Sequence, residues 1–496
     1  MEEKLYLNKN YFDMQRGKHR AVEVIKSDTN SVLLKTEEGK MLKICDDIKK
    51  LALYNERLEW LEAISNRSDL SDYVVLPTKR LTGLKYGEFG YVCELEQDVN
   101  LNYYVKPMKG EKLFKWYYDK TGGLEYRLQI GYNIAVALEN IHELGYCLVD
   151  VCPENTTITK YNADEKKPPA IQFIGADNIC SYTYHPLIAG SDMYCDPLVY
   201  LNRTGNSISS DTYSYAIMLF ELLTTCHPFV GADCEDLSED EIIKKVNSGT
   251  LDYIDDWDVD SNKNEDYEDT QLFVSNELEN LFYKMFVKGK LDTSQRPALS
   301  EFRKACLKSM QKIIKCTHTG CERDYPYNVA KNCPFCNYPT ENVLVAKVKK
   351  ITSSTEELLL PYDNLKKFTS LPEVEEMVGF MIIKQGLNKL PKSFFAPLID
   401  SDSGATGIWI QYSPEKGKYI IRNRFKKIKL KTKDKLLEPF VNKEFAAMSD
   451  CEFPNYSETT IEFPANALLE SEDLVEINCK EYGNIKYKWI LTIGKE

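Results

Sequence analysis

IHELGYCLVDVCPENTTI, residues 141–158, joins the end of an apolar helical pattern to a strand rich in Thr and Ile. The loop between them carries Asp150 and, five residues later, Asn155. An acid and an amide at this spacing, between a helix and a strand, are what a phosphotransfer loop needs. Leu148 and Val149, directly before the acid, are not what such a loop normally carries. The question is whether the loop is catalytic or only has the shape of a catalytic loop.

Strand patterns precede this loop and helical patterns follow it. Short runs rich in apolar residues predict strands at 22–27, 31–36, 40–45 and 89–97. Apolar residues at helical spacing predict helices at 47–65, 126–144, 210–225 and 293–315. We expect Ser210 or Asp211 to be the N-cap of the third of these helices. The acidic stretch 233–269 is interpreted as a solvated surface loop, with a metal site as the alternative.

Composition limits the class of protein. The chain has 496 residues, 43% of them hydrophobic and 28% charged, which is enough for about three domains with buried cores. The net charge of −13 argues against general affinity for nucleic acid or anionic membranes. No stretch has the roughly 18 apolar residues of a membrane span, and MEEKLYLNKN (1–10) has no apolar h-region. Most of the fifteen cysteines are scattered singly, so we expect a cytoplasmic protein with reduced thiols.

The order of these elements and several motifs resemble those of protein kinases. KMLKIC (40–45) is similar to the third-strand motif of that family, which implies that Lys43 pairs with the nucleotide phosphates. The helix at 47–65 would supply its carboxylate partner, Glu56 as first choice and Glu59 as second. The resemblance further implies that Asp150 accepts or orients the substrate hydroxyl and that Asn155 binds metal.

Two more segments complete the resemblance. SSDTYSYAIMLFELLTTCHPFVG (209–231) is similar to the family's structural helix, which implies that Asp211 ties down the backbone of the catalytic loop. RPALSEF resembles the closing helix motif, with Arg296 in its usual place. The resemblance is closer to the bacterial kinases whose loop reads G-D-x-N, in which the His and Arg before the acid are commonly absent, than to kinases at large. That branch implies a metal-dependent protein phosphatase and a von Willebrand A-type protein as partners.

The chain departs from the kinase pattern at the phosphate loop. When IKSDTNSVLL is aligned with this loop, Lys26, Asp28 and Ser31 occupy the three glycine positions. Glycines let backbone amides approach phosphates closely, and a carboxylate at residue 28 would repel them.

Two further departures affect the metal site and a conserved ion pair of the kinase family. IQFIGADNI (171–179) matches the metal-binding motif by its apolar strand, but Gly175 stands where the metal-binding acid belongs. Asp177, two residues later, is the alternative second metal ligand. MYCDPL resembles the end of the activation segment with Leu198 in place of Glu, so we expect Arg296 to lack its usual partner.

Four cysteines cluster after residue 315 with the spacing C-x4-C-x11-C-x2-C. Cys316, Cys321, Cys333 and Cys336 suit tetrahedral thiolate coordination of a structural Zn²⁺ that closes a small ribbon. Disulfide bonds are the alternative. His318 lies inside the first loop and is interpreted as a bystander.

The remaining chain alternates apolar and polar residues. Strands are expected around 407–412, 418–423, 427–433, 459–463, 475–482 and 486–494, which predicts an antiparallel sandwich or small barrel. A basic run in this block predicts a solvated strand face, or alternatively a surface that binds phosphate or acidic groups. The run comprises Lys416, Lys418, Arg422, Arg424, Lys426, Lys427, Lys429, Lys431 and Lys433.

The sequence predicts an α+β chain with a bilobal protein kinase-like fold, a zinc ribbon and an all-β C-terminal domain. The expected boundaries are 15–97 for the N-lobe, 98–312 for the C-lobe, 313–341 for the ribbon and 342–496 for the recognition domain. The expected activity is ATP- and Mg²⁺-dependent phosphotransfer to Ser/Thr hydroxyls of a protein. The alternatives are a pseudokinase scaffold that binds protein partners and a protein that transfers a nucleotide instead.

Overall fold

The computed structural model divides the chain into two compact units. Unit 1 comprises Met1–Met310 with Arg323–Asn328, and unit 2 comprises Gln311–Glu322 with Val329–Glu496. Helices and sheets both contribute, as the sequence predicts. The structure describes residues 5–27, 31–46, 68–94, 99–164, 168–175, 178–181, 190–263, 270–327, 332–340, 343–359, 366–395, 405–413, 418–423, 429–431, 436–437, 440–441, 457–464, 475–478 and 485–495.

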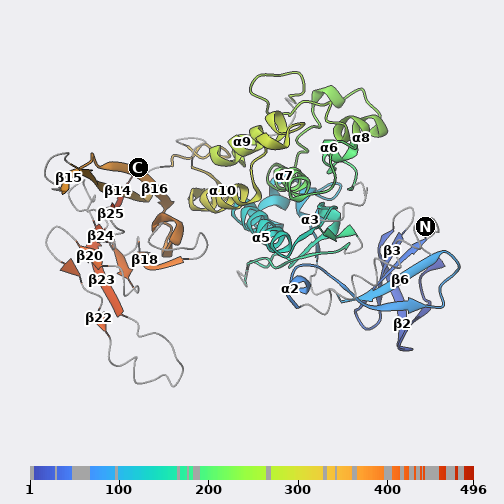
Figure 1. Ribbon diagram of the computed structural model, residues 1–496. Helices are drawn as coiled ribbons and strands as arrows, with labels where there is room; N and C mark the ends of the chain where they lie inside the picture. The colour runs from blue at the N-terminus through green and yellow to red at the C-terminus, as the bar shows by residue number, and fades with distance from the viewer. Residues whose placement is uncertain are drawn as a thin grey trace. The chain divides into compact units, whose positions relative to one another are not determined.

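Unit 1 begins with a closed antiparallel barrel, drawn in blue in Figure 1. Its strands follow the order β1-β2-β3-β4-β6-β5. Apolar side chains from alternate positions, among them Val32, Leu34, Leu42 and Ile44, form one buried core cluster. The bounds are Asn10–Asp13 for β1, Lys18–Ser27 for β2, Ser31–Thr36 for β3, Met41–Asp46 for β4, Pro77–Thr82 for β5 and Glu88–Cys93 for β6.

Closure of the barrel depends on β1, a strand that the sequence analysis did not predict. It pairs with β2 on one side and with β5 on the other. Asp13 at its end accepts hydrogen bonds from the backbone N–H of Gln15 and Gly17 and lies 3.0 Å from His19 Nε2. Lys79 Nζ of β5 lies 3.1 Å from the same carboxylate. One buried acid therefore joins the β1–β2 turn to β5.

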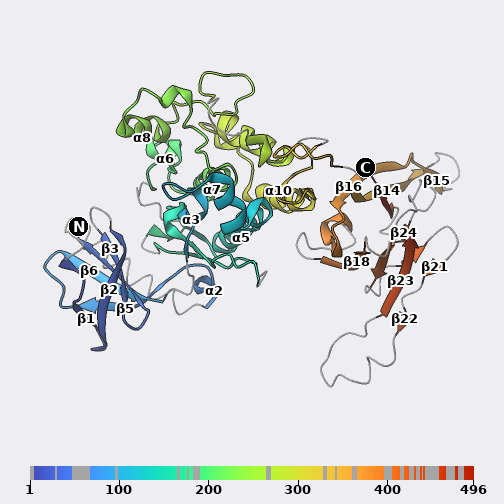
Figure 2. The same cartoon turned by 180° about the vertical axis from the view of Figure 1, so that it is seen from behind.

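The rest of unit 1 is mainly helical. Helices α5 and α7 pack against each other, and both views of the ribbon show them side by side (Figures 1 and 2). Their burial agrees with the predicted apolar pattern: Ile130, Ile134, Leu138 and Ile141 of α5 are all nearly inaccessible to solvent. The helices are α2 Ser68–Ser71, α3 Asn102–Val105, α4 Leu113–Lys115, α5 Gly123–Glu143, α6 Pro197–Tyr200, α7 Ile208–Thr224, α8 Glu239–Asn247, α9 Asn276–Tyr283 and α10 Leu299–Gln311.

Short strands lie among these helices. A three-stranded sheet has the order β10-β9-β7, and β8 pairs with β11. β10 meets the chain that precedes β5, because Phe173 exchanges backbone hydrogen bonds of 2.8 Å with residues 73 and 75. The strands are β7 Val99–Asn100, β8 Tyr146–Cys147, β9 Thr156–Ile158, β10 Ile171–Phe173, β11 Cys180–Ser181 and β13 Asp324–Pro326.

Two sequence-based expectations about helix starts and loops were wrong. The N-cap of α7 is Ser207, not Ser210 or Asp211, since Ser207 and Ser210 form a reciprocal capping box. The acidic stretch 233–269 is not a continuous loop, because α8 lies within it and is capped by Ser238 and Glu241. Among the described residues of that stretch, no group of acids is arranged to hold a metal ion.

Unit 2 is built from β-strands, as the sequence predicts. Long β14 pairs with β25 from Leu344 opposite Lys495 to Ser354 opposite Ile485, and β25 places Trp489 in the core. One sheet contains β14, β15, β16, β20, β21, β24 and β25, and another contains β17, β18, β19, β22 and β23 (Figure 2). The bounds are β12 Ile313–Lys315, β14 Leu344–Leu359, β15 Lys366–Ser370, β16 Val374–Ile382, β17 Gly386–Pro391, β18 Ala405–Ser413, β19 Lys418–Asn423, β20 Lys429–Lys431, β21 Leu436–Leu437, β22 Phe440–Val441, β23 Ser457–Pro464, β24 Val475–Asn478 and β25 Ile485–Lys495.

Within the described residues, none of the helices combines the length and the apolar character that crossing a bilayer would require. The predicted helix at 47–65, with Glu56 and Glu59, lies outside the described residues, as do Asp28 and Asp177. Of the basic run, Lys418 and Arg422 fall in β19 and Lys429 and Lys431 in β20. The other members of the run lie outside the described residues.

Candidate functional site

Asp211 of α7 binds the backbone at the start of the loop 148–155. The Asp211 carboxylate accepts hydrogen bonds from the backbone N–H of Leu148 at 2.8 Å and of Val149 at 2.9 Å. Its Oδ2 also lies 2.9 Å from His142 Nε2 near the end of α5. Asp211 is only 1% exposed, so these contacts are shielded from water. The prediction that Asp211 ties down the backbone of this loop is confirmed.

These bonds hold a strained backbone. Val149 has a φ of +74°, a conformation that β-branched residues rarely adopt. Its side chain is buried with Cys147 and Cys180 in a small apolar cluster. Because the next residue is Asp150, the strain and the Asp211 contacts together fix the direction in which the Asp150 side chain leaves the loop.

Asp150 and Asn155 are in direct contact. The Asn155 amide donates from Nδ2 to Asp150 Oδ2 at 2.6 Å and to the Asp150 backbone oxygen at 3.2 Å. Pro153–Asn155 form a single 3-10 turn, which brings the amide back over the acid. The structure therefore brings together the two predicted site residues with which the sequence analysis began.

Two contacts to Asp150 were not predicted. The backbone N–H of Ser191 donates to Asp150 Oδ1 at 2.6 Å, and Asn178 Nδ2 donates to Asp150 Oδ2 at 3.3 Å. Asn178 follows the apolar strand β10 by five residues. An amide side chain this soon after an apolar strand could have identified Asn178 as a candidate site residue from the sequence.

Gly175, which the sequence resemblance aligns with a metal-binding acid, lies beside this pair. A Cβ added to Gly175 would lie 3.6 Å from both Cγ and Nδ2 of Asn155, so a side chain here would face the amide. Gly175 has a φ of +96°, which favours glycine. A side chain at residue 175 would therefore face the Asp150–Asn155 pair, but glycine supplies no ligand atom.

Lys43 lies in β4 between Leu33 of β3 and Tyr91 of β6. Leu42 and Ile44 point into the barrel, so alternation along the strand places Lys43 on the opposite face with Met41. That outer face belongs to a second buried cluster, against which Ile174 packs. Lys43, which is half-buried, thus lies on the same face of β4 as Met41 and Cys45 of this cluster, against which Ile174, the residue before Gly175, packs.

Arg296 does not pair at position 198, which is Leu, but it has another ion-pair partner that the sequence did not predict, Asp196. Its Nη1 lies 2.5 Å from Asp196 Oδ2 and its Nη2 lies 2.9 Å from Asp196 Oδ1. Leu198 cannot form this pair, and the acid that forms it is Asp196, two residues earlier. Both side chains are 2% exposed.

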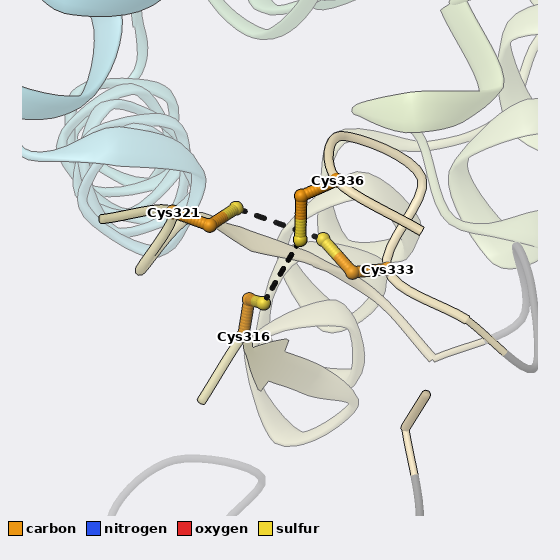
Figure 3. A group of neighbouring side chains, drawn as sticks. All are labelled: Cys316, Cys321, Cys333 and Cys336. Atoms are coloured by element: carbon orange, nitrogen blue, oxygen red, sulfur yellow. Dashed lines mark hydrogen bonds between the residues drawn. The ribbon is translucent and has the colours of Figure 1, made fainter. Parts of the chain in front are cut away.

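The four clustered cysteines face one another, and Figure 3 shows their sulfur atoms converging. The Sγ atoms of Cys316 and Cys336 lie 3.6 Å apart, and those of Cys321 and Cys333 lie 3.8 Å apart. All four sulfur atoms lie within 4.8 Å of one another. Sulfur atoms at about 2.3 Å from one tetrahedral Zn²⁺ are roughly 3.8 Å apart, so the set can hold this ion.

One contact in the cluster suits a thiolate ligand. The backbone N–H of His318 donates to Cys316 Sγ at 3.4 Å, a contact that favours a charged sulfur. The four thiols are free, so the disulfide alternative is not what the structure shows at these residues. The His318 ring stacks on Tyr338 and does not belong to the group of four converging sulfur atoms.

Asp324, which lies between Cys321 and Cys333 in the sequence, contacts the start of α5. Asp324 accepts hydrogen bonds from the backbone N–H of Leu124 at 3.0 Å and of Glu125 at 2.8 Å. Gly122, the residue before the helix, has no side chain to cap these donors. Asp324 therefore caps the helix that leads into the Asp150 loop, a role that sequence reasoning missed.

Comparison with known proteins gives a partial match to protein kinases. The chain is 30% identical over 113 residues to ribosomal protein S6 kinase alpha-6 of Homo sapiens, which covers 20% of this chain. It is 32% identical over 103 residues to putative ribosomal protein S6 kinase alpha-1 of Caenorhabditis elegans, covering 21% of this chain. The match to ribosomal protein S6 kinase 2 alpha of Xenopus laevis is 31% over 106 residues, or 20% of this chain.

This chain spans about 13% of the length of each of these curated relatives. No protein-family model matches the chain. The similarity therefore indicates a kinase-like relationship for part of the chain.

Proposed function

We propose that residues 15–312 form a bilobal protein kinase-like unit that binds ATP and transfers its terminal phosphate to a Ser or Thr hydroxyl of a protein. The observation that carries this proposal is the contact between Asp150 and Asn155 on a loop held by Asp211. The partial similarity to S6 kinases supports it. The barrel would be the N-lobe and the helices around α5 and α7 the C-lobe.

Each side chain has a role in this proposal. Asp150 accepts or orients the proton of the hydroxyl nucleophile, and Asn155 keeps its carboxylate in place. Lys43 would bind the α- and β-phosphates, with Glu56 or Glu59 as its partner. A bound Mg²⁺ would neutralise charge on the transferred phosphate. Asn155 fits such an ion, whereas Gly175 offers no ligand.

A pseudokinase that binds protein partners is the second candidate, and Gly175 favours it. Loss of one preorganised electrostatic contact in the transition state commonly costs about 3 kcal/mol, or about a hundredfold in rate. The chain also lacks glycine at all three positions of the phosphate loop. A pseudokinase would retain the Asp150–Asn155 geometry and Asp211 anchor as structural features.

Labelled ATP distinguishes these functions. With γ-labelled ATP and Mg²⁺ or Mn²⁺, a kinase labels itself or a generic acceptor protein, and Asp150→Ala abolishes the label. The exposed Asp164→Ala variant is the matched control and should label normally. Equal labelling by Asp150→Ala would refute the assignment of this residue. Label from α-labelled ATP would favour nucleotide transfer, and thermal stabilisation by ATP without labelling would favour the pseudokinase.

For the remainder of the chain we propose a structural zinc ribbon followed by a β-rich recognition domain. The four converging sulfur atoms support the ribbon, because a site with all four positions filled by protein leaves no place for a catalytic water. A metal-dependent protein phosphatase and a von Willebrand A-type protein are the proposed partners. Metal analysis after dialysis should find about one zinc ion per chain, and a zinc-free protein would refute the ribbon.

A further inference from the structure

The Asp150 carboxylate is held by two amide side chains rather than one. Asn155 Nδ2 and Asn178 Nδ2 both donate to the same oxygen, Oδ2, at 2.6 and 3.3 Å. Asn155 comes from the turn before β9, whereas Asn178 comes from the chain after β10. Two segments that are separate in the sequence therefore each place an asparagine amide at Asp150 Oδ2.

A backbone hydrogen bond holds Asn178 close to Gly175. The backbone N–H of Asn178 donates to the Gly175 oxygen at 2.9 Å. Gly175 itself lies beside Asn155 but has no side chain. The amide of Asn178 therefore reaches the Asp150 carboxylate at a place where Gly175 supplies no group.

The contact with Asp150 also fixes which end of each amide points outward. An ionised carboxylate only accepts hydrogen bonds, so the NH₂ group of each amide must face it and the carbonyl oxygen must face away. Of the residues that the structure describes, none donates a hydrogen bond to Oδ1 of Asn155 or of Asn178. Asparagine carbonyl oxygens are good ligands for hard divalent cations.

We propose that Asn178 is a second amide ligand for the divalent cation that accompanies the nucleotide, at the position that Gly175 leaves empty. This inference rests on the nucleotide site proposed above. A neutral amide replaces a carboxylate, so the protein alone holds the cation weakly and the nucleotide phosphates supply most of the negative charge. Metal binding then depends on nucleotide, and nucleotide binding depends on Asn178 only when metal is present.

Calorimetric titration of the full chain with ATP tests this dependence, with Mn²⁺ and separately with EDTA. Asn178→Ala should weaken ATP binding in Mn²⁺ by about tenfold or more and leave binding in EDTA unchanged. Asn178→Asp should restore binding in Mn²⁺ and weaken it in EDTA, because a second carboxylate beside Asp150 repels phosphate unless a cation is bound. Asn280→Ala, an exposed amide on α9, is the control and should match wild type in both titrations.

The outcomes separate this inference from the proposed function. If wild type binds ATP in a Mn²⁺-dependent manner and Asn178→Ala binds equally well, the role of Asn178 is refuted while the nucleotide site stands. If Asn178→Ala weakens binding equally in Mn²⁺ and EDTA, Asn178 supports the fold rather than the cation, and the inference is also refuted. If wild type binds no ATP in either condition, both proposals fail.

Discussion

Arg296 and Asp196 form a buried ion pair with two contacts, Nη1 to Oδ2 at 2.5 Å and Nη2 to Oδ1 at 2.9 Å. Asp196 is also the N-cap of α6, where its side chain accepts from the backbone N–H of Leu198. Arg296 further donates from Nε to the Gly289 oxygen at 2.7 Å. The ion pair therefore joins Asp196 at the start of α6 to Arg296 in the chain before α10.

Breaking this pair should destabilise unit 1 strongly. Arg296→Met leaves Asp196 as an unpaired buried charge, which typically costs about 3–5 kcal/mol of unfolding free energy. Denaturant unfolding followed by circular dichroism measures this loss. Arg20→Met removes one partner of the exposed Arg20–Glu37 pair and serves as the control, with an expected cost of about 0–1 kcal/mol. Equal losses in the two variants would contradict the importance of the buried pair.

Asp211 should be essential for the geometry of the Asp150 loop. Asp211→Ala removes the acceptor of two buried backbone N–H groups, and each unsatisfied donor costs about 1–3 kcal/mol. We therefore expect faster hydrogen exchange at Leu148 and Val149 together with a lower unfolding free energy. Asp236→Ala, at an exposed turn, should change neither quantity. Unchanged exchange at the two amides in the Asp211 variant would show that the loop keeps its conformation without the acid.

Glu221 should make the protein less stable as pH rises toward neutrality. Burial raises its pKa to about 7, although the hydrogen bond from the Tyr194 hydroxyl opposes this shift. The folded state therefore binds a proton that the unfolded chain releases above pH 4.5 or so, and stability declines between about pH 4.5 and 7 by at most about 1.4 kcal/mol per pH unit. Glu221→Gln should remove this component and be the more stable protein at pH 8. A pH profile with the same slope in both proteins would refute the assignment.

Metal removal should expose the start of α5. Asp324 caps this helix from the segment between Cys321 and Cys333, and the metal would close that segment into a short loop. Chelation or Asp324→Ala should therefore accelerate hydrogen exchange at Leu124 and Glu125, with a capping loss of about 1–2 kcal/mol. Amides of α8 are the internal control. If chelation leaves the exchange of α5 unchanged while Asp324→Ala accelerates it, the cap does not depend on metal.

The features that could be predicted from the sequence are those that depend on a local pattern of residues. Apolar spacing located α5 and α7, and strand alternation located β3, β4 and β25 to within a few residues. The spacing of the four cysteines located the cluster that could hold a metal ion, because ligand spacing is a local property of the chain. The acid–amide spacing in the Asp150 loop also depends on only six residues.

Contacts between distant segments could not be predicted in this way. Asp196 lies 100 residues from Arg296, and only folding shows that the two form an ion pair. Asp324 is 200 residues from Leu124 and carries no signal of a helix cap in its own surroundings. β1 is four residues long, too short for its alternation to identify a strand that closes a barrel.

In the proposed kinase-like unit, Lys43 and the Asp150–Asn155 pair belong to one nucleotide site. An acyl-phosphate derivative of ATP can show this, because it transfers its acyl group to a lysine beside the bound phosphates. Mass spectrometry of the labelled full chain should find the modification at Lys43, excess ATP should prevent it, and Asp211→Ala should reduce it. Labelling spread over surface lysines, with Lys43 unmodified or insensitive to ATP, would refute a shared nucleotide site.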